Sequence, residues 1–316
     1  GKDTERQLLS KDQIAKNIEG QLRCFSKVLD FEGENAAIIV NNADWLCELG
    51  FLDVLRDVGK YFSVNEMIKK EGKFTYIEKG EGVPLILLHG LMGGVDNFGS
   101  MVDVVADAGF KVLAPDLKLF KVPLLKTSIK YLSDYINDFM RHKNLEKAVL
   151  VGNSLGGHIA LVFSKKYPEK VEGMVLTGSS GLYEKAMGDS FPRRGDYEYI
   201  KVKTEEEFYD TKTATKELVD KVFDIANKRA SVIRLLAFAK SAIRHNMAED
   251  IPRFTMPVCL IWGKQDKVTP PYVAEEFHIL FPNSELFWID KCGHSPMWEH
   301  PEKFSEITID WLGNHF

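Results

Sequence analysis

Residues 150–158 read LVGNSLGGH. They include the end of an apolar run, KAVLVGN (147–153), that has the composition of a buried strand, and Ser154 follows it directly. Glycines at 152 and 156 flank this serine and indicate a turn so tight that a side chain at either position would clash. The turn either packs a strand against a helix, or it holds Ser154 in a strained conformation from which its hydroxyl can attack a substrate.

Downstream of residue 72, short apolar runs alternate with amphipathic stretches of helical period. The runs that we predict as strands are 74–78, 83–90, 111–116, 147–153, 171–178, 256–263 and 284–290. Continuous apolar strands are typical of a parallel sheet covered by helices on both faces. Alternating strands and helices indicate right-handed crossovers. The sequence therefore predicts an α/β fold with a doubly wound, mostly parallel sheet over residues 73–316.

The strand rhythm stops between about residues 184 and 252. The segments 204–210, 216–230 and 233–246 have the pattern of helices inserted between two core strands. Ligands of open parallel sheets bind beyond the carboxyl ends of the strands. We therefore expect this insertion to form a helical lid over that edge.

The first 72 residues follow a different pattern. A helix is predicted within 10–30, a strand at 35–42 (NAAIIVNN) and helices over 45–70. We expect residues 1–72 to form a short α/β fragment that precedes the larger domain.

A serine hydroxyl is a weak nucleophile that needs a base, and the base needs a partner that fixes its tautomer. Where G-x-S-x-G joins a strand to a helix, these partners follow along the chain in the order acid, then histidine. Asp266 comes shortly after strand 256–263, and His294 comes shortly after strand 284–290. The order and the positions at strand ends predict Ser154 as nucleophile, His294 as base and Asp266 as its partner.

An oxyanion intermediate needs N–H donors from the backbone. One is expected from Leu155, directly after the serine, and the other from Leu91 in the loop HGLMGG (89–94). His89 ends a buried strand, and we interpret it as a structural residue that shapes this loop. His158 and His300 are likewise interpreted as structural or surface residues.

Taken together, these motifs resemble those of the α/β-hydrolase superfamily over residues 73–316. The stretches that carry the resemblance are HGLMGG (89–94), GNSLGG (152–157), WGKQD (262–266) and Gly293-His294. The resemblance is strongest to lid-bearing esterases and to carbon–carbon bond hydrolases that cleave ring-fission diketones. It implies a Ser-His-Asp triad that works without a cofactor. A serine at the turn argues against the dehalogenase and epoxide-hydrolase branches, which use aspartate there.

Two departures bear on the substrate. Leu-Met-Gly-Gly follows His-Gly, where the carbon–carbon hydrolases usually carry a longer glycine-proline loop. The segment after Pro115 runs DLKLFKVPLLK and lacks the glycine-rich continuation that is common in relatives. We expect a serine hydrolase that acts on a small carbonyl substrate, an ester or thioester. A carbon–carbon bond hydrolase of diketo acids and a non-catalytic ligand-binding protein on the same fold stay open as alternatives.

The amino-terminal fragment resembles an internal piece of bacterial tyrosyl-tRNA synthetase. The matching stretches are GKDTERQLLS (1–10), KVLDFEGENAAIIVNNADWL (27–46) and FLDVLRDVGKYFSVNEMIKK (51–70). The nucleotide-binding HxGH-like and KMSKS-like signatures of the synthetase are absent from the sequence. We therefore expect this fragment to be non-catalytic.

Composition limits the partners. The 316 residues carry a formal net charge of −5, so no bulk field attracts nucleic acid. No apolar run reaches the length of a membrane span, and no His/Cys/Asp/Glu cluster has metal-ligand spacing. We expect a cytoplasmic protein with a small-molecule substrate, no metal, no cofactor, and no nucleic-acid or membrane partner. The sequence leaves a homo-oligomer open.

Overall fold

The structure, a computed structural model, describes residues 11–33, 36–38, 68–183 and 193–316. The chain divides into two units, Gly1–Val64 and Asn65–Phe316. In the first unit, helix α1 (Lys11–Phe25) confirms the helix predicted within 10–30. The predicted strand 35–42 lies mostly outside the described residues, and 36–38 have no regular structure. Residues 45–67 of the predicted helical stretch also lie outside them.

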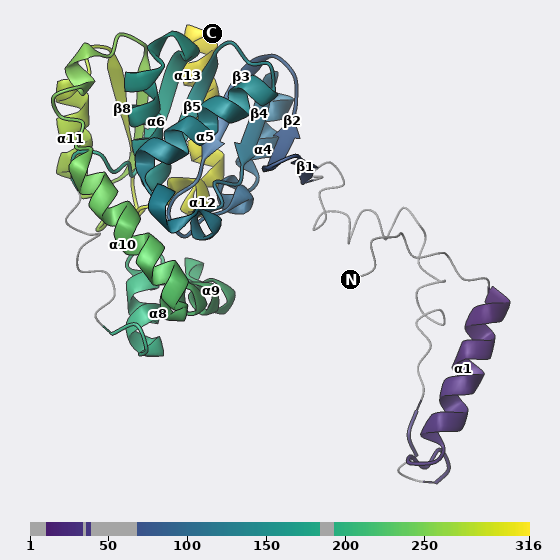
Figure 1. Cartoon of the computed structure of the whole chain (residues 1–316). Coiled ribbons are helices and arrows are strands. Elements are labelled where there is room, and N and C mark those ends of the chain that lie inside the picture. Colours follow the sequence, from purple (N-terminus) through teal and green to yellow (C-terminus); the bar gives the residue numbers. More distant parts are fainter. Residues whose placement is uncertain (1–10, 34–35, 39–67, 184–192) are drawn as a thin grey trace. The chain divides into compact units, whose positions relative to one another are not determined.

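An eight-stranded sheet in the order β1-β2-β4-β3-β5-β6-β7-β8 runs through the described part of the second unit (Figure 1). The strands are β1 (Lys69–Glu71), β2 (Phe74–Lys79), β3 (Val83–Leu88), β4 (Phe110–Pro115), β5 (Ala148–Asn153), β6 (Val171–Thr177), β7 (Val258–Gly263) and β8 (Ser284–Ile289). Strand β2 is antiparallel to both of its neighbours, β1 and β4. The six strands β4, β3, β5, β6, β7 and β8, in sheet order, are parallel to one another. The predicted α/β class and the seven strands predicted downstream of residue 72 are confirmed.

Strand β1 alters the expected division of the chain. Its first two residues fall within the predicted helical stretch 45–70, yet Lys69 pairs with Tyr76 of β2 in the sheet. The sheet therefore begins before residue 73, where we expected the second domain to start. The two units divide after Val64 instead.

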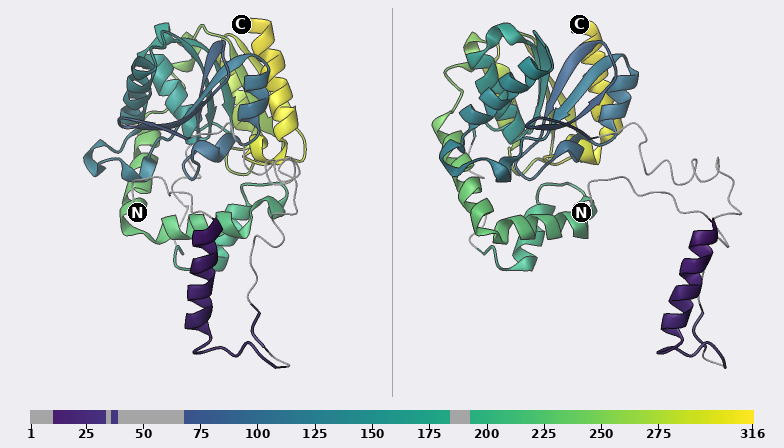
Figure 2. Two further views of the ribbon diagram at one scale, coloured as in Figure 1. Left: turned by 90° about the vertical axis from the view of Figure 1, so that its right-hand side faces the viewer. Right: turned by 45° about the vertical axis from the view of Figure 1, so that its right-hand side comes forward.

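Helices cover both faces of the sheet. They are α4 (Met101–Asp107), α5 (Ile129–His142), α6 (Leu155–Lys166), α11 (Pro271–Leu280), α12 (Pro296–Glu299) and α13 (Pro301–His315). Buried side chains of α5, α6 and α11 join one hydrophobic cluster, and those of α4 and α13 join the cluster on the other face. In Figure 2 the yellow carboxyl-terminal helix accordingly lies across the sheet from the teal helices.

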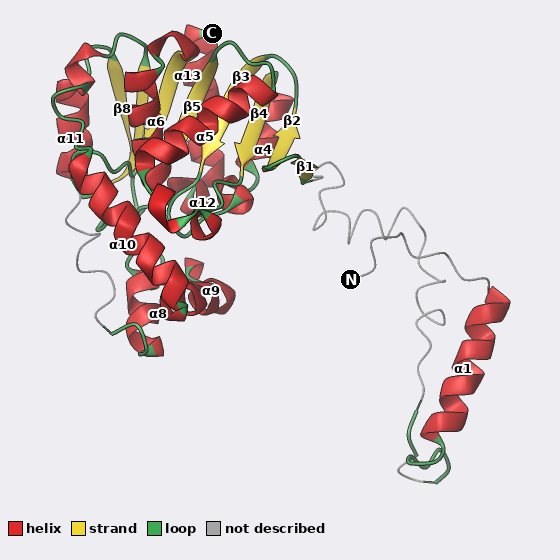
Figure 3. Ribbon diagram, in the orientation of Figure 1, coloured by secondary structure: helices red, strands yellow, loops and turns green. Residues whose placement is uncertain are grey.

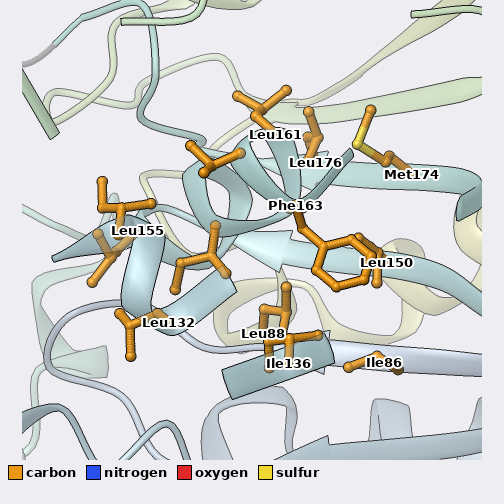
Figure 4. Close-up of a cluster of buried hydrophobic side chains, with 14 of the residues drawn as sticks. Ile86, Leu88, Leu132, Ile136, Leu150, Leu155, Leu161, Phe163, Met174 and Leu176 are labelled. Carbon is orange, nitrogen blue, oxygen red and sulfur yellow. The ribbon is translucent and has the colours of Figure 1, made fainter. Parts of the chain in front are cut away.

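The two clusters follow from the alternation of side chains along each strand. In β3, Ile86 and Leu88 face the α5–α6 side, whereas Leu85 and Leu87 face the α4–α13 side. Figure 4 shows Leu88 beside other buried side chains on the α5–α6 side. Because both faces are buried, each strand reads as a continuous apolar run, and this is why the strands could be located from the sequence.

The helical insertion lies between β6 and β7 and contains α8 (Tyr197–Glu205), α9 (Lys216–Asn227) and α10 (Arg229–Arg244). It lies at the carboxyl edge of the sheet (Figure 3). The predicted helix 204–210 is wrong, because α8 starts earlier, where the Asp196 carboxylate accepts the Tyr199 N–H, and it ends at Glu205. The predicted helix 216–230 is also divided in two by Lys228, whose ψ is 110°. Residues 184–192 lie outside the described residues.

Candidate active site

Ser154 stands at the junction of β5 and α6 with φ 53° and ψ −118°, a conformation that non-glycine residues rarely adopt. The neighbouring glycines permit this turn. A Cβ on Gly156 would overlap the carbonyl oxygen of Leu88, and a Cβ on Gly152 would lie 2.6 Å from the Cα of Gly157. The chain therefore makes the strained strand-to-helix turn that G-x-S-x-G predicts.

Backbone hydrogen bonds fix the turn from both sides. The N–H of Ser154 donates to the carbonyl of Thr177 at 3.1 Å, and the carbonyl of Ser154 accepts from the N–H groups of His158 and Ser180 at 3.2 Å. Thr177 and Ser180 belong to the end of β6 and the loop after it. The surrounding structure thus over-determines the strained conformation, which is the condition under which such strain persists.

His294 and Asp266 form a buried pair. Nδ1 of His294 lies 2.9 Å from Oδ2 of Asp266, and neither residue is more than 3% exposed. Oδ1 of Asp266 also accepts the N–H groups of Val268 at 2.8 Å and Thr269 at 2.9 Å. Because the carboxylate only accepts hydrogen bonds, Nδ1 of His294 carries the proton and Nε2 is left as the basic nitrogen.

The charge of Asp266 sets the protonation of His294. Burial by itself lowers the pKa of a histidine, but the charge of Asp266, the hydrogen bond to it and the charge of Glu207 outweigh burial, so the pKa of His294 is raised above 6.5. A base with a raised pKa takes a proton more readily, and the pair is built to stabilise an imidazolium.

Gln265 joins the two loops that carry this pair. Its N–H donates to the carbonyl of Cys292 at 3.0 Å, and its side-chain Oε1 accepts the N–H of Cys292 at 3.0 Å. Gln265 directly precedes Asp266, and Cys292 stands two residues before His294. These two bonds hold the acid loop and the histidine loop in register.

The serine turn also contacts the histidine loop. The side-chain amide of Asn153 donates to the carbonyls of Thr177 and His294, each at 3.3 Å. Gly178 has φ 52°, and a Cβ there would lie 2.7 Å from Nδ1 of His294. The structure thus brings the loops of Ser154, Asp266 and His294 together at the carboxyl edge of the sheet.

The two predicted oxyanion donors belong to the serine turn and to the loop after β3. Leu155 is the first residue of α6, and Leu91 follows the end of β3. A Cβ on Gly90 would lie 3.4 Å from the Cβ of Ser154, so this loop runs directly beside the serine. Among the described residues, no hydrogen bond is found for the N–H of Leu91 or the N–H of Leu155.

His89 holds the loop after β3. Its Nδ1 donates to the carbonyl of Gly90 at 2.9 Å, and its Nε2 accepts the N–H of Leu117 at 3.1 Å. Burial lowers the pKa of His89, which keeps the ring neutral and preserves this pattern. The structural role that we inferred from the sequence agrees with these contacts.

One cavity lies beside the loop after β3, and a second lies away from the candidate residues. The smaller, of about 130 Å³, lies beside the loop after β3 and is lined by His89, Gly93, Asp116, Lys118, Leu119, Phe120 and Lys121. The larger, of about 390 Å³, is lined by Lys147, Pro168, Val171, Glu172, Arg253, Phe254, Thr255, Met256 and Phe316 and holds none of the candidate residues. The smaller cavity is likewise lined by none of Ser154, Asp266, His294, Leu91 and Leu155.

Neither a metal site nor a membrane span is found in the described parts of the chain. Among those residues, no three or more His, Cys, Asp or Glu side chains come together as metal ligands. No helix there is both long enough and apolar enough to cross a membrane.

Sequence reasoning missed several residues that hold the site. Asn153 and Gln265 lie inside the motifs that we quoted, and Glu299 lies five residues after His294 in CGHSPMWEHP. Position within a motif was the available signal. No such signal marked Glu207. Desolvation raises the pKa of its carboxyl, and the charge of His294 offsets this rise only in part.

The amino-terminal segment matches known proteins of another kind. The profile of the class I tRNA synthetases for tryptophan and tyrosine matches residues 1–104, past the predicted end of the fragment at residue 72. The tyrosine–tRNA ligase of Mesorhizobium japonicum is 36% identical over 147 residues, which cover 40% of this chain. The aligned part spans only 35% of that ligase.

The rest of the chain is similar to hydrolases. The 2-hydroxy-6-oxo-6-(2'-aminophenyl)hexa-2,4-dienoic acid hydrolase of Metapseudomonas resinovorans is 30% identical over 251 residues, which cover 75% of this chain and 86% of the relative. The crystal structure of MGS-MChE2, an α/β hydrolase enzyme from the metagenome of lagoon sediments of Mar Chica, Morocco, is 46% identical. It superposes with a TM-score of 0.66 over 78% of this chain and 98% of that chain.

The profile of the α/β hydrolase fold matches residues 83–222 and 235–301, which contain Ser154, Asp266 and His294. The observed sheet order, the strained serine turn and the buried histidine–aspartate pair agree with this match. This chain is a member of the α/β hydrolase fold family.

Proposed function

We propose that this hydrolase cleaves a small carbonyl substrate with Ser154 as nucleophile, His294 as base and Asp266 as the partner of the base. The observation that carries the proposal is the 2.9 Å hydrogen bond between His294 and Asp266 beside the strained turn of Ser154. This bond occupies Nδ1 and leaves Nε2 to take the serine proton.

The reaction follows from these roles. As the Ser154 hydroxyl attacks the carbonyl carbon, its proton passes to His294, and Asp266 stabilises the resulting imidazolium. The N–H groups of Leu91 and Leu155 bind the oxyanion. The leaving group takes the proton back from His294, and water then releases the acyl group by the same route. The helical insertion serves as a lid that limits the access of water.

An ester or thioester is the first candidate substrate. The short Leu-Met-Gly-Gly sequence after Gly90 differs from the glycine-proline loop of the carbon–carbon hydrolases, and this difference supports the ester. The second candidate is the carbon–carbon bond of a diketo acid. It is favoured by the relative from Metapseudomonas resinovorans, which is named for a 2-hydroxy-6-oxo-hexadienoic acid.

The first test is intact-mass analysis after exposure to a fluorophosphonate probe. We expect a single adduct on the unchanged protein and on Ser100→Ala, a matched control at an exposed serine, but none on Ser154→Ala. An adduct that persists in Ser154→Ala would contradict the assigned nucleophile. Absence of any adduct on folded protein would favour the alternative of a non-catalytic ligand-binding protein.

Turnover then separates the two substrates. Aryl esters of increasing acyl length are compared with vinylogous diketo acids at equal concentration, with Ser154→Ala as the background in each case. Faster Ser154-dependent turnover of the esters supports the first candidate, and faster turnover of the diketo acids supports the second.

We also propose that the synthetase-like segment takes no part in aminoacylation and binds no tRNA. The net charge of −5 and the missing nucleotide-binding signatures support this. Salt-sensitive binding of tRNA to the full chain would contradict it.

A further inference from the structure

The carboxylate of Glu299 bridges the helical insertion and the loop of His294. Its Oε1 accepts the N–H groups of Tyr209 at 2.7 Å and Asp210 at 3.0 Å, both in the insertion. Its Oε2 accepts the N–H of Gly293 at 2.6 Å, directly before His294. Hydrogen bonds from N–H groups to an ionised carboxylate are roughly twice as strong as neutral ones. Both oxygens are therefore used, each on a different segment.

Other contacts run along the same seam. The N–H of His294 donates to the carbonyl of Glu207 at 2.7 Å. The ring of Phe208, which is buried, stacks on Trp298 with ring centroids 5.9 Å apart. A Cβ on Gly293 would lie 2.5 Å from the same Glu207 carbonyl, so the two backbones approach as closely as a glycine allows. The insertion segment around Phe208 is thus attached directly to the histidine loop.

We infer that Glu299 is a positioning residue that sets the place of His294 by clamping its loop to the insertion. This inference rests on the proposed role of His294 as base. Glu299 itself lies outside the triad and acts through the backbone N–H of Gly293, directly before His294. Any movement of the segment Tyr209–Asp210 is therefore transmitted to the histidine loop through one rigid carboxylate.

Substitution of Glu299 by Gln tests the clamp at nearly constant shape. A glutamine keeps one acceptor oxygen and gains an NH2 group, which cannot accept an N–H. Either the N–H groups of Tyr209 and Asp210 or the N–H of Gly293 must then lose the oxygen that accepts it. Displacement of a catalytic group by about 1 Å can cost about 100-fold in rate. We expect labelling of Ser154 by the fluorophosphonate to slow by about 10- to 100-fold.

The ionisation of His294 gives a readout that does not depend on turnover. In a Ser154→Ala background, the imidazole is titrated by NMR with and without Glu299→Gln. The charged groups that act on the ring are Asp266 and Glu207. If the clamp sets the distance to Asp266, the pKa of His294 falls toward 6.5 in the Glu299 variant, because the contact with Asp266 that raises it is weakened.

The matched control is Glu302→Gln, the same exchange at an exposed glutamate three residues along the chain. It should leave both the labelling rate and the titration unchanged. An unchanged titration of His294 in Glu299→Gln, with any loss of labelling explained by a smaller folded fraction, would overturn the inference. If the unchanged protein itself fails to react with the probe, the proposed function fails, while the titration still decides the role of Glu299.

Glu299→Asp provides a second variant in case Glu299→Gln does not fold. It keeps the charge but is shorter by one methylene, so that it cannot reach both segments. The same fall in the pKa of His294 is expected, and a titration identical to that of the background would again overturn the inference.

Discussion

The side-chain amide of Asn153 donates a 3.3 Å hydrogen bond to the backbone carbonyl of His294. It also donates to the carbonyl of Thr177 at the end of β6. The residue before Ser154 therefore holds the loop of the proposed base against the serine turn. The relative position of nucleophile and base depends on a side chain that takes no part in the proposed chemistry.

Replacement of Asn153 by alanine should slow the reaction of Ser154 while the protein stays folded. The carbonyl of His294 loses its donor, which costs about 1–3 kcal/mol of unfolding free energy, whereas the carbonyl of Thr177 keeps the N–H of Ser154. Because the His294 loop is released, labelling by a fluorophosphonate should slow by about 10-fold or more. Labelling rates and urea unfolding are compared with Asn314→Ala, an exposed control. A labelling rate equal to that of the unchanged protein would refute the prediction.

The exchange Asp266→Asn should remove about 10⁴-fold in turnover while the fold persists. The amide can still accept the N–H groups of Val268 and Thr269 through its oxygen, but its NH2 group then faces Nδ1 of His294. The imidazole must then adopt the other tautomer, in which Nε2 carries the proton and cannot act as a base. Turnover within tenfold of the unchanged protein would exclude Asp266 as the partner.

The same pair predicts the pH dependence of turnover. His294 works as a base only when neutral, and its pKa is raised above 6.5 by the charge of Asp266 and the hydrogen bond to it. Activity should therefore fall as the pH drops through a value above 6.5. In Asp266→Asn, the residual activity should survive to lower pH, because the charge that raises the pKa is absent. Profiles of kcat/KM against pH for both proteins provide the check.

The strands and the order of the proposed triad were predictable because their signals are local. A buried parallel strand is apolar along its whole length, and Asp266 and His294 each follow such a strand closely. The glycines that flank Ser154 in the sequence indicate its tight turn. Position at the carboxyl ends of parallel strands is enough to expect that the three residues meet.

The residues that fix the site geometry depend on contacts far apart in the sequence. Glu299 binds Tyr209 across ninety positions, and no local pattern encodes that pairing. The predicted helix 204–210 failed for a similar reason, since the segment after Glu205 leaves the helix to contact His294 and Glu299. β1 was missed because the three exposed residues of this edge strand carry no apolar signal.

Two glycine-to-alanine exchanges should have opposite effects. At Gly156 the new Cβ would overlap the Leu88 carbonyl of β3, so Gly156→Ala should abolish labelling of Ser154 and destabilise the fold. At Gly313 in α13 no atom lies within 4 Å of the Cβ, and an alanine there should raise the free energy of unfolding by about 0.5–1 kcal/mol. Urea unfolding measures both. A stable, reactive Gly156→Ala would contradict the close approach of β3 and α6.

Buried His158 should make the protein less stable in mild acid. Its Nε2 donates to the carbonyl of His245 at the end of α10, at 2.7 Å. Burial lowers the pKa of His158 from 6.5 to about 4, and the hydrogen bond to His245 opposes this only in part. Between these two values the unfolded chain binds a proton that the folded chain does not, so the free energy of unfolding must fall as the pH falls.

The full effect of this difference is about 3 kcal/mol, lost between pH 6.5 and about 4. His158→Gln keeps an N–H donor but does not titrate, so its unfolding free energy should depend less steeply on pH over that range. Urea unfolding above pH 6.5 and midway toward pH 4 tests this, with the exposed His278→Gln as control. Equal slopes in His158→Gln and the unchanged protein would mean that His158 is protonated in the folded state, because a ring that binds its proton equally in both states contributes nothing to the slope.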